Sequence, residues 1–238
     1  MLEQVARYRR VRDRALFVGD ADDVVAHPFG PGLPSIRDWT REHFAFTGYV
    51  TGFAPPDEEE RQRLRAAFGF RPDERVCVVS VGGSGVGRDL LRRAVAAYPG
   101  AARDVPGLRM LVVTGPRIDP TSLDAPAGVE VRGFVPDLHR HLAAADLGIV
   151  QGGLTTTMEL TAARRPFLYF PLKRHFEQRI HVRHRLERYG AGRMMEYDDA
   201  SPEVLAEAIA KELQRPVDYL PVATDGAARA AAALAELL

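Results

Sequence analysis

The 238-residue sequence contains one cysteine and no long apolar run, and both features limit its class. A single cysteine, Cys77, permits no disulfide within the chain, which is typical of proteins kept in a reducing compartment. No stretch approaches the roughly 20 apolar residues that span a bilayer. The N-terminus is a charged segment rather than a signal peptide, so the expected location is cytoplasmic.

The sequence also lacks an excess of charge of either sign. Its 32 Lys and Arg residues balance 32 Asp and Glu residues, which gives a formal net charge of zero. This balance gives no support to nucleic-acid binding, and we expect no nucleic-acid partner. Arginines are concentrated in residues 1–14 and 179–188. Solvated helix surfaces account for both clusters, and the alternative for the first is a peripheral contact with an anionic membrane or a partner.

From residue 76 onwards, short apolar stretches alternate with helical ones. Val76–Val81 and Leu147–Val150 are continuous apolar runs, as in strands that are buried on both faces. The alternation predicts an α/β fold with a doubly wound, Rossmann-like parallel sheet of about six strands. The other strands are predicted at 109–114, 129–134, 166–171 and 193–196, and the helices at 89–98, 136–144, 155–164, 176–189, 202–213 and 226–237.

The first part of the chain has a different pattern. Strands are predicted at 15–19 and 44–50, and the segment 20–43 is predicted to be irregular because of its Pro- and Gly-rich stretch HPFGPGLPS. Two short strands cannot form an independent core. We therefore predict that residues 1–53 are the remnant of a larger unit plus a linker, and that 54–238 form the main domain.

A glycine-rich loop, GGSGVG at 82–87, follows the first buried strand and precedes a helix. This arrangement is typical of phosphate binding, and it makes Gly83, Ser84 and Gly85 candidate ligands. The loop is not a P-loop, because no Gly-Lys-Ser/Thr follows. It also fails the dinucleotide pattern, because its third glycine comes one residue early. A tight strand-to-helix turn without a ligand is the alternative.

A second glycine turn follows the strand at 147–150. Gly153 precedes a helical segment that begins near Thr155 and Thr156, and free N–H groups at a helix N-terminus favour an anion. Glu159 lies farther along this helix, where its carboxylate could accept two hydrogen bonds from a vicinal diol such as that of ribose. Alternatively, Thr156-x-x-Glu159 is a capping box that needs no ligand.

Polar residues also follow the strand at 166–171. Glu177 and Gln178 suit sugar hydroxyls, and we place His175 in the same candidate site, although a polar helix N-terminus is the alternative. Phe134 and Val135 end another predicted strand, where their backbone groups could contact the edge of a base. No H-E-x-x-H motif occurs, and we expect neither a metal nor another cofactor.

Taken together, these motifs resemble the C-terminal, donor-binding half of GT-B-type glycosyltransferases. They are most similar to the peptidoglycan UDP-N-acetylglucosamine transferase family. The resemblance covers about residues 45–213 and implies a nucleotide-sugar donor. The matching pieces are VVSVGGSGVG at 78–87, VRGFVPDLHRHLAAADLGIVQGGLTTTMEL at 131–160, PFLYFPL at 166–172 and HFEQRIHVRHRLERYGAG at 175–192.

The resemblance also implies a role for each candidate residue. It places Glu159 on the ribose and Gln178, with Glu177 beside it, on the donor sugar. The donor phosphates are then held by Gly83, Ser84, Gly85, Gly153, Thr155 and Thr156, and the uracil by Phe134 and Val135.

The family's acceptor site and catalytic base belong to an N-terminal domain, of which residues 1–53 hold at most the last strands. We therefore expect the base to lie outside this chain, in a missing domain or a separate acceptor-binding subunit. The predicted activity is the donor half of a hexosyltransferase that moves a sugar from UDP to an acceptor hydroxyl. The alternatives are an isomerase similar to UDP-N-acetylglucosamine 2-epimerases and a non-catalytic nucleotide-sugar-binding subunit of a split transferase.

Overall fold

The computed structural model describes residues 3, 7, 13–83 and 85–237. Ser84 and most of the basic segment 1–14 therefore lie outside the described residues. The chain divides into two compact units, which we call the smaller and the larger unit. The smaller unit comprises Met1–Ala54 with Pro221–Leu238, and the larger comprises Pro55–Leu220.

The larger unit is built on a parallel sheet of six strands in the order β5-β4-β3-β6-β7-β8. In chain order this is 3-2-1-4-5-6, the order of doubly wound dinucleotide-binding folds. The predicted fold class is thus confirmed. The strands are β3 (Arg75–Ser80), β4 (Leu108–Val113), β5 (Val129–Arg132), β6 (Leu147–Val150), β7 (Phe167–Tyr169) and β8 (Arg193–Met194).

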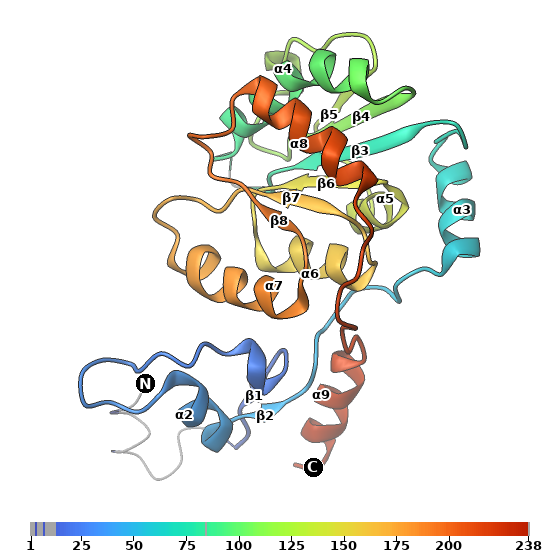
Figure 1. Cartoon of the computed structure of the whole chain (residues 1–238). Helices are drawn as coiled ribbons and strands as arrows, with labels where there is room; N and C mark the ends of the chain where they lie inside the picture. The colour runs from blue at the N-terminus through green and yellow to red at the C-terminus, as the bar shows by residue number, and fades with distance from the viewer. Residues whose placement is uncertain (1–2, 4–6, 8–12, 84, 238) are drawn as a thin grey trace. The chain divides into compact units, whose positions relative to one another are not determined.

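Helices cover both faces of this sheet (Figure 1). α4 (Arg88–Asp104) and α8 (Pro202–Gln214) pack together on one face, and α6 (Leu154–Ala162) lies on the other face beside α5 and α7. The helix predicted at 176–189 is interrupted, because its first part is a π-helix, η3. The remaining elements are α3 (Glu58–Ala67), η2 (Pro120–Ser122), α5 (Leu138–Ala144), η3 (Glu177–Val182) and α7 (Arg183–Tyr189).

The core of the larger unit lies between the sheet and helices α4 and α8. Cys77 and Val79 of β3, Leu91 of α4 and Leu205 of α8 are all completely buried. Each fully buried aliphatic side chain stabilises the fold by about 1.5–3 kcal/mol relative to an exposed one. The continuous apolar runs that predicted buried strands are therefore explained by helices on both sides of the sheet.

A buried ion cluster fastens α3 to the amino edge of the sheet. Asp146 accepts hydrogen bonds from Arg61 at 2.7 Å, from Arg65 at 3.0 Å and from the backbone N–H of Val76 at 2.8 Å. The side chains of Arg65 and Asp146 are only 5% and 12% exposed. Because all three partners converge on one carboxylate, this cluster fixes the end of the sheet opposite the candidate site.

The smaller unit contains two very short parallel strands, β1 (Leu16–Phe17) and β2 (Ala45–Phe46). Between them lie a 3₁₀ turn, η1 (Ala21–Asp23), and helix α2 (Ile36–His43). The expectation that 20–43 is irregular is therefore confirmed for the HPFGPGLPS stretch at 27–35 but was wrong for 21–23 and 36–43, which form η1 and α2. Ser35 caps α2 by accepting the N–H of Asp38.

The C-terminal helix α9 (Gly226–Ala235) belongs to the smaller unit, although residues 221–238 were expected within the main domain. The backbone joins the segment before α9 to the rest of the smaller unit. The N–H of Tyr49 donates to the carbonyl of Ala223 at 2.7 Å, and Val50 forms an antiparallel β-bridge with Asp225. That residues 1–53 derive from an acceptor domain stays a prediction.

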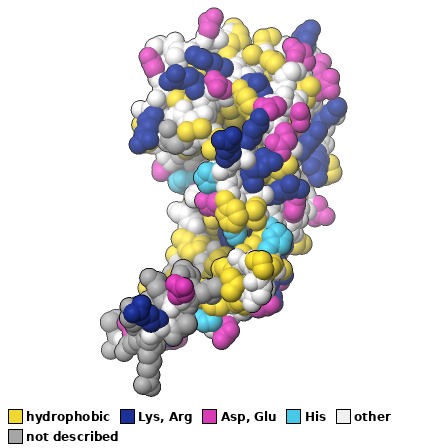
Figure 2. Space-filling view, turned by 90° about the vertical axis from the view of Figure 1, so that its left-hand side faces the viewer, with side chains coloured by type: hydrophobic (Ala, Val, Ile, Leu, Met, Phe, Trp, Pro, Cys, Tyr) yellow, Lys and Arg dark blue, Asp and Glu magenta, His cyan; other side chains and the backbone are white. Residues whose placement is uncertain are grey.

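Basic and acidic side chains are interspersed over the face of the larger unit seen in Figure 2. This mixture agrees with the formal net charge of zero. Within the described part of the chain, no helix has the length and apolar composition needed to cross a membrane.

Candidate functional site

The candidate site is organised by strands β3 and β6, which are neighbours in the sheet although β4 and β5 separate them in the chain. After β3 the chain continues into α4 on one face, and after β6 it continues into α6 on the other. The two connections diverge at the carboxyl ends of adjacent strands. Open parallel sheets bind their ligands in the crevice that such a switch point creates.

The loop after β3 is held close to the sheet. Gly87 is the N-cap of α4, and a Cβ atom there would lie 2.2 Å from the Cβ of Val81. Packing therefore requires glycine at this position. This requirement is also met by a tight strand-to-helix turn without a ligand, so Gly87 does not distinguish the two interpretations of the loop. Gly83 is exposed and Gly85 is partly buried, so backbone groups of this loop remain accessible to a ligand.

The loop after β6 presents the N-terminus of α6. Gly152 has a φ of 82°, which an L side chain rarely adopts, and Gly153 is the N-cap residue. Neither Thr155 nor Thr156 uses its backbone N–H or its hydroxyl in a hydrogen bond with any described residue. The first turn of a helix carries such free donors and the positive end of the helix dipole. This end of α6 is therefore suited to an anion.

The structure also tests one of the two interpretations of Glu159, the capping box. Because α6 begins at Leu154, Thr156 is its third residue rather than its N-cap, and the N-cap Gly153 has no side chain. The capping-box interpretation is therefore wrong. Glu159 is partly buried, and no described residue donates a hydrogen bond to its carboxylate. Burial raises the pKa of this carboxyl to about 6.

Gln178 lies in the π-helix η3, an element that is frequent at functional sites. Its side-chain oxygen accepts the backbone N–H of Leu172 at 2.9 Å. This bond sets the orientation of the carboxamide, because only its oxygen can accept. The NH₂ group has no hydrogen-bond partner among the described residues, although the side chain is only 9% exposed. It is therefore available as a donor to a ligand.

These segments enclose a hollow of about 320 Å³ at the switch point, which we call the first hollow. It brings together five of the predicted site residues. Sequence reasoning missed Gln151, because an isolated glutamine before two glycines carries no recognisable signal. The first hollow is lined by Ser80, Val81, Gly82, Gly83, Val86, Val150, Gln151, Gly153, Thr156, Leu172, His175 and Gln178.

None of the other predicted residues that the structure describes lines the first hollow. Thr155 and Glu159 lie on α6, and an exposed Glu177 begins η3. Phe134 and Val135 follow β5 at the same edge of the sheet, where Phe134 is 76% exposed and Val135 is buried. An aromatic side chain this exposed can pack against a flat ligand or another protein surface.

The described residues that line the first hollow include no carboxylate. Its polar groups include several donors: the amides of Gly153 and Thr156, the Thr156 hydroxyl and the Gln178 NH₂ group. His175 is exposed, and its Nδ1 accepts the backbone N–H of Gln178 at 3.4 Å. This composition favours a negatively charged ligand that presents acceptor oxygens.

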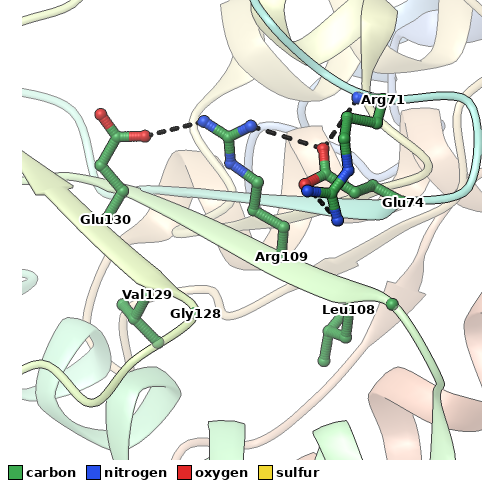
Figure 3. A pocket seen from close by; sticks show the side chains of 8 residues that line it. Arg71, Glu74, Leu108, Arg109, Gly128, Val129 and Glu130 are labelled. Carbon is green, nitrogen blue, oxygen red and sulfur yellow. Dashed lines mark hydrogen bonds and ion pairs between the residues drawn. The ribbon is translucent and has the colours of Figure 1, made fainter.

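A hollow at the opposite, amino edge of the sheet has a different character (Figure 3). Arg109 donates to Glu130 at 3.1 Å and to Glu74 at 3.4 Å, and Arg71 pairs with Glu74 at 3.5 Å. Because these charges satisfy one another, they stabilise the edge of the sheet rather than offer a site for a ligand.

The fold and the first hollow define the class of the protein as a Rossmann-like α/β domain with an anion-suited site at its switch point. The chain belongs to the family described as glycosyltransferase family 28 C-terminal domain, whose model matches residues 76–238. This finding agrees with the resemblance seen in the sequence motifs.

Relatives and solved structures agree with this membership. The chain is 29% identical to an uncharacterised glycosyltransferase of Methanopyrus kandleri over 77% of this chain and 52% of the relative. It is 36% identical to the UDP-N-acetylglucosamine--N-acetylmuramyl-(pentapeptide) pyrophosphoryl-undecaprenol N-acetylglucosamine transferase of Mycolicibacterium vanbaalenii, over 71% of this chain and 42% of that one. The crystal structure of the kitacinnamycin glycosyltransferase is similar in fold, with a TM-score of 0.55 and 21% identity over 83% of this chain and 46% of that chain.

The chain thus spans about half the length of the curated relatives that it matches. The fold is the C-terminal half of the GT-B architecture, as predicted. Among the described residues, no group of three or more His, Cys, Asp or Glu side chains is placed to hold a metal ion. That no metal is needed stays a prediction from the sequence.

Proposed function

We propose that the chain is the donor-binding half of a glycosyltransferase and that the first hollow holds the diphosphate of a UDP-sugar. The observation that carries this proposal is the N-terminal end of α6. There the N–H groups of Thr155 and Thr156 donate to no described residue, and the described lining of the adjacent hollow includes no carboxylate. Two phosphates would supply the acceptor oxygens that these donors lack. The named substrate of the Mycolicibacterium relative supports UDP as the nucleotide.

The remaining parts of the donor are assigned to the residues that the resemblance to the family implies. Glu159 lies one helical turn beyond Thr155 and Thr156 on the same side of α6, so its carboxylate is placed for a ribose diol. The backbone after β5, at Phe134 and Val135, is assigned to the base. The loop at Gly83, Ser84 and Gly85 contacts the phosphates, and His175, Glu177 and Gln178 contact the donor sugar.

The proposed reaction is a direct displacement at the anomeric carbon. The acceptor oxygen forms a bond to this carbon while the bond to the diphosphate oxygen breaks, and the hydroxyl proton passes to a base. UDP is the leaving group. The N-terminus of α6 and the loop amides stabilise the charge that develops on it, without a metal. We assign no residue of this chain as the base.

The acceptor site and the base are assigned to a partner, either an N-terminal domain or a separate subunit. The support is that the chain spans about half of its relatives and that the described part of its smaller unit has only two strands, of two residues each. A peripheral membrane contact through the basic N-terminal segment belongs to the same proposal. The epimerase alternative is not favoured, because the reported relatives are named transferases.

A thermal-shift series tests the nucleotide assignment. A ligand that binds only the folded chain raises stability by about 2.7 kcal/mol at one hundred times its Kd. We expect UDP to raise the melting temperature more than TDP, GDP or UMP at equal concentration. UMP is the control for the second phosphate. The absence of any shift with all diphosphates would reject the proposal.

A further inference from the structure

A second hollow, of about 310 Å³, adjoins the first at the same edge of the sheet. The two share Val86, Gln151 and Leu172 as a common wall. The first hollow is lined by the N-terminal end of α6, whereas the second is lined by the first turn of α4. These two helices cover opposite faces of the sheet. A ligand group that leaves the first hollow past Gln151 would therefore enter the second.

The second hollow has different chemistry from the first. Its wall includes the carboxylates of Asp89 and Asp198 and the ammonium group of Lys173, which forms an ion pair with Asp198. Because two carboxylates outnumber one ammonium group, the charged side chains of this wall are negative in sum and disfavour a phosphate. The buried side chains of Leu90, Phe170 and Pro171 provide an apolar wall.

Several polar groups of the second hollow remain available to a ligand. Neither the Gln151 carboxamide nor the Tyr197 hydroxyl forms a hydrogen bond with a described residue. Among the described residues, Asp89 forms only a loose ion pair, with Arg92 at 3.9 Å. These groups provide both donors and acceptors, as a compound with many hydroxyls requires.

Arg93 holds Tyr197 in its place at the second hollow. Its guanidinium carbon lies 3.6 Å from the centre of the Tyr197 ring, and its Nη1 donates to the Tyr197 carbonyl. Because the ring is fixed by these two contacts, the hydroxyl of Tyr197 is positioned before any ligand binds.

We propose that the second hollow is a subsite for an uncharged sugar ring. Such a ring presents hydroxyls to Asp89, Gln151 and Tyr197 and its C–H groups to the apolar wall. The ring is either the donor sugar, which would then extend from the contacts at Gln178 into the second hollow, or one sugar of the acceptor, the rest of which the partner would hold. This proposal deepens the proposed function and relies on it only for the position of the diphosphate in the first hollow.

The test uses the full chain with the substitutions Asp89→Asn and Tyr197→Phe, alone and combined. Both residues line only the second of the two hollows, and both substitutions keep the size of the side chain. Asp104→Asn is the matched control, because Asp104 is exposed at the far end of the same helix, α4. If the combined variant fails to fold, Asp89→Asn alone gives the answer, since Asp89 is an exposed residue.

Two measurements separate the two sources of the sugar. Calorimetry gives the affinities for UDP and for UDP-N-acetylglucosamine, and saturation-transfer NMR follows free N-acetylglucosamine with and without UDP. If the donor sugar occupies the second hollow, the combined variant loses at least about fivefold in affinity for UDP-N-acetylglucosamine and keeps its affinity for UDP. If an acceptor sugar occupies it, only the signal of the free sugar falls, by half or more.

The proposal is overturned if neither quantity changes, if Asp104→Asn changes them equally, or if the unsubstituted chain binds no sugar in either measurement. Failure of the proposed function gives a different result. In that case UDP does not bind, while free N-acetylglucosamine still binds and still responds to Asp89→Asn.

Discussion

The side-chain oxygen of Gln178 accepts the backbone N–H of Leu172 at 2.9 Å, and this bond joins the π-helix η3 to the loop after β7. Both residues line the first hollow. Because this bond occupies the carboxamide oxygen, the NH₂ group of Gln178 is the part of the carboxamide that remains for a ligand. The side-chain oxygen thus serves the fold as an acceptor, and the NH₂ group is the donor that we propose for the ligand.

Substitution Gln178→Glu separates these two roles. A carboxylate can still accept the Leu172 N–H, but it has no donor and adds a negative charge beside the proposed diphosphate. We expect affinity for UDP-N-acetylglucosamine to fall by about tenfold or more at neutral pH, while the chain stays folded. Calorimetry measures the affinity, and circular dichroism checks the fold.

The matched control is Gln214→Glu, an exposed glutamine at the end of α8. This variant should bind like the unsubstituted chain. Equal affinity in Gln178→Glu and the control would show that the Gln178 NH₂ group does not contact the ligand.

The pKa of Glu159 predicts how donor binding depends on pH. Burial raises this pKa to about 6, and only the ionised carboxylate can accept two hydrogen bonds from a diol. We expect affinity for UDP-N-acetylglucosamine to decrease several-fold as the pH falls from about 7.5 to 5. Calorimetry across this range tests the prediction, because the two phosphates of the nucleotide-sugar do not titrate there. In Glu159→Gln the affinity should be weak and independent of pH.

The same shift in pKa has a consequence for stability that serves as a control. A raised folded-state pKa means that the stability from this group is present below its ordinary pKa of 4.5 and is lost as pH rises through about 6. Glu159→Gln should therefore raise the melting temperature at pH 7.5 and leave it nearly unchanged at pH 4. A lower melting temperature at pH 7.5 would indicate a structural role for the carboxylate instead.

The ion cluster at Asp146 should be one of the largest polar contributions to stability. Removing this carboxylate in Asp146→Ala leaves Arg65, whose side chain is 5% exposed, as an uncompensated buried charge. We expect a loss of about 3–5 kcal/mol in the free energy of unfolding, measured by urea denaturation. Arg63→Ala is the control, because Arg63 lies on α3 as Arg65 does but has a side chain that is 65% exposed. This substitution should change the free energy of unfolding by less than about 1 kcal/mol. A change below about 1 kcal/mol in Asp146→Ala would contradict the assigned role.

Much of the larger unit was predictable because its signals are local. The run Leu147–Val150 is a strand at its predicted bounds, and the turns at Gly82–Gly87 and Gly152–Gly153 lead into helices as expected. A fully apolar run followed by glycines has few alternatives in an α/β protein. The resemblance to a family then added roles that composition alone did not provide.

The features that were missed depend on contacts between distant residues or on hidden local signals. The grouping of α9 with the smaller unit rests on Tyr49 and Ala223, which are far apart in the sequence. Helix α2 had a signal in Ser35-x-x-Asp38, but the preceding Pro and Gly residues obscured it. The position of the α6 N-cap, at Gly153 directly before Leu154, excluded the capping box for Glu159, and a shift of this size is beyond sequence reasoning.

The central claim is that the N-terminus of α6 binds the diphosphate, and Gly153→Asp tests it without damage to the fold. Gly153 has a φ of −69° and ψ of 143°, and a Cβ atom there would meet nothing within 4 Å. An aspartate at this N-cap can accept from the first-turn N–H groups and interacts favourably with the dipole, so it should stabilise the helix by about 0.5–1 kcal/mol. It would also place a negative charge where the phosphates bind.

The decisive measurement is the titration of UDP, by calorimetry, into the unsubstituted chain, Gly153→Asp and the neutral variant Gly153→Asn. The account predicts that the unsubstituted chain binds UDP, that Gly153→Asn binds more weakly, and that Gly153→Asp melts at a higher temperature and binds no UDP. Binding of UDP by Gly153→Asp with unchanged affinity would contradict the claim that this helix end is the diphosphate site.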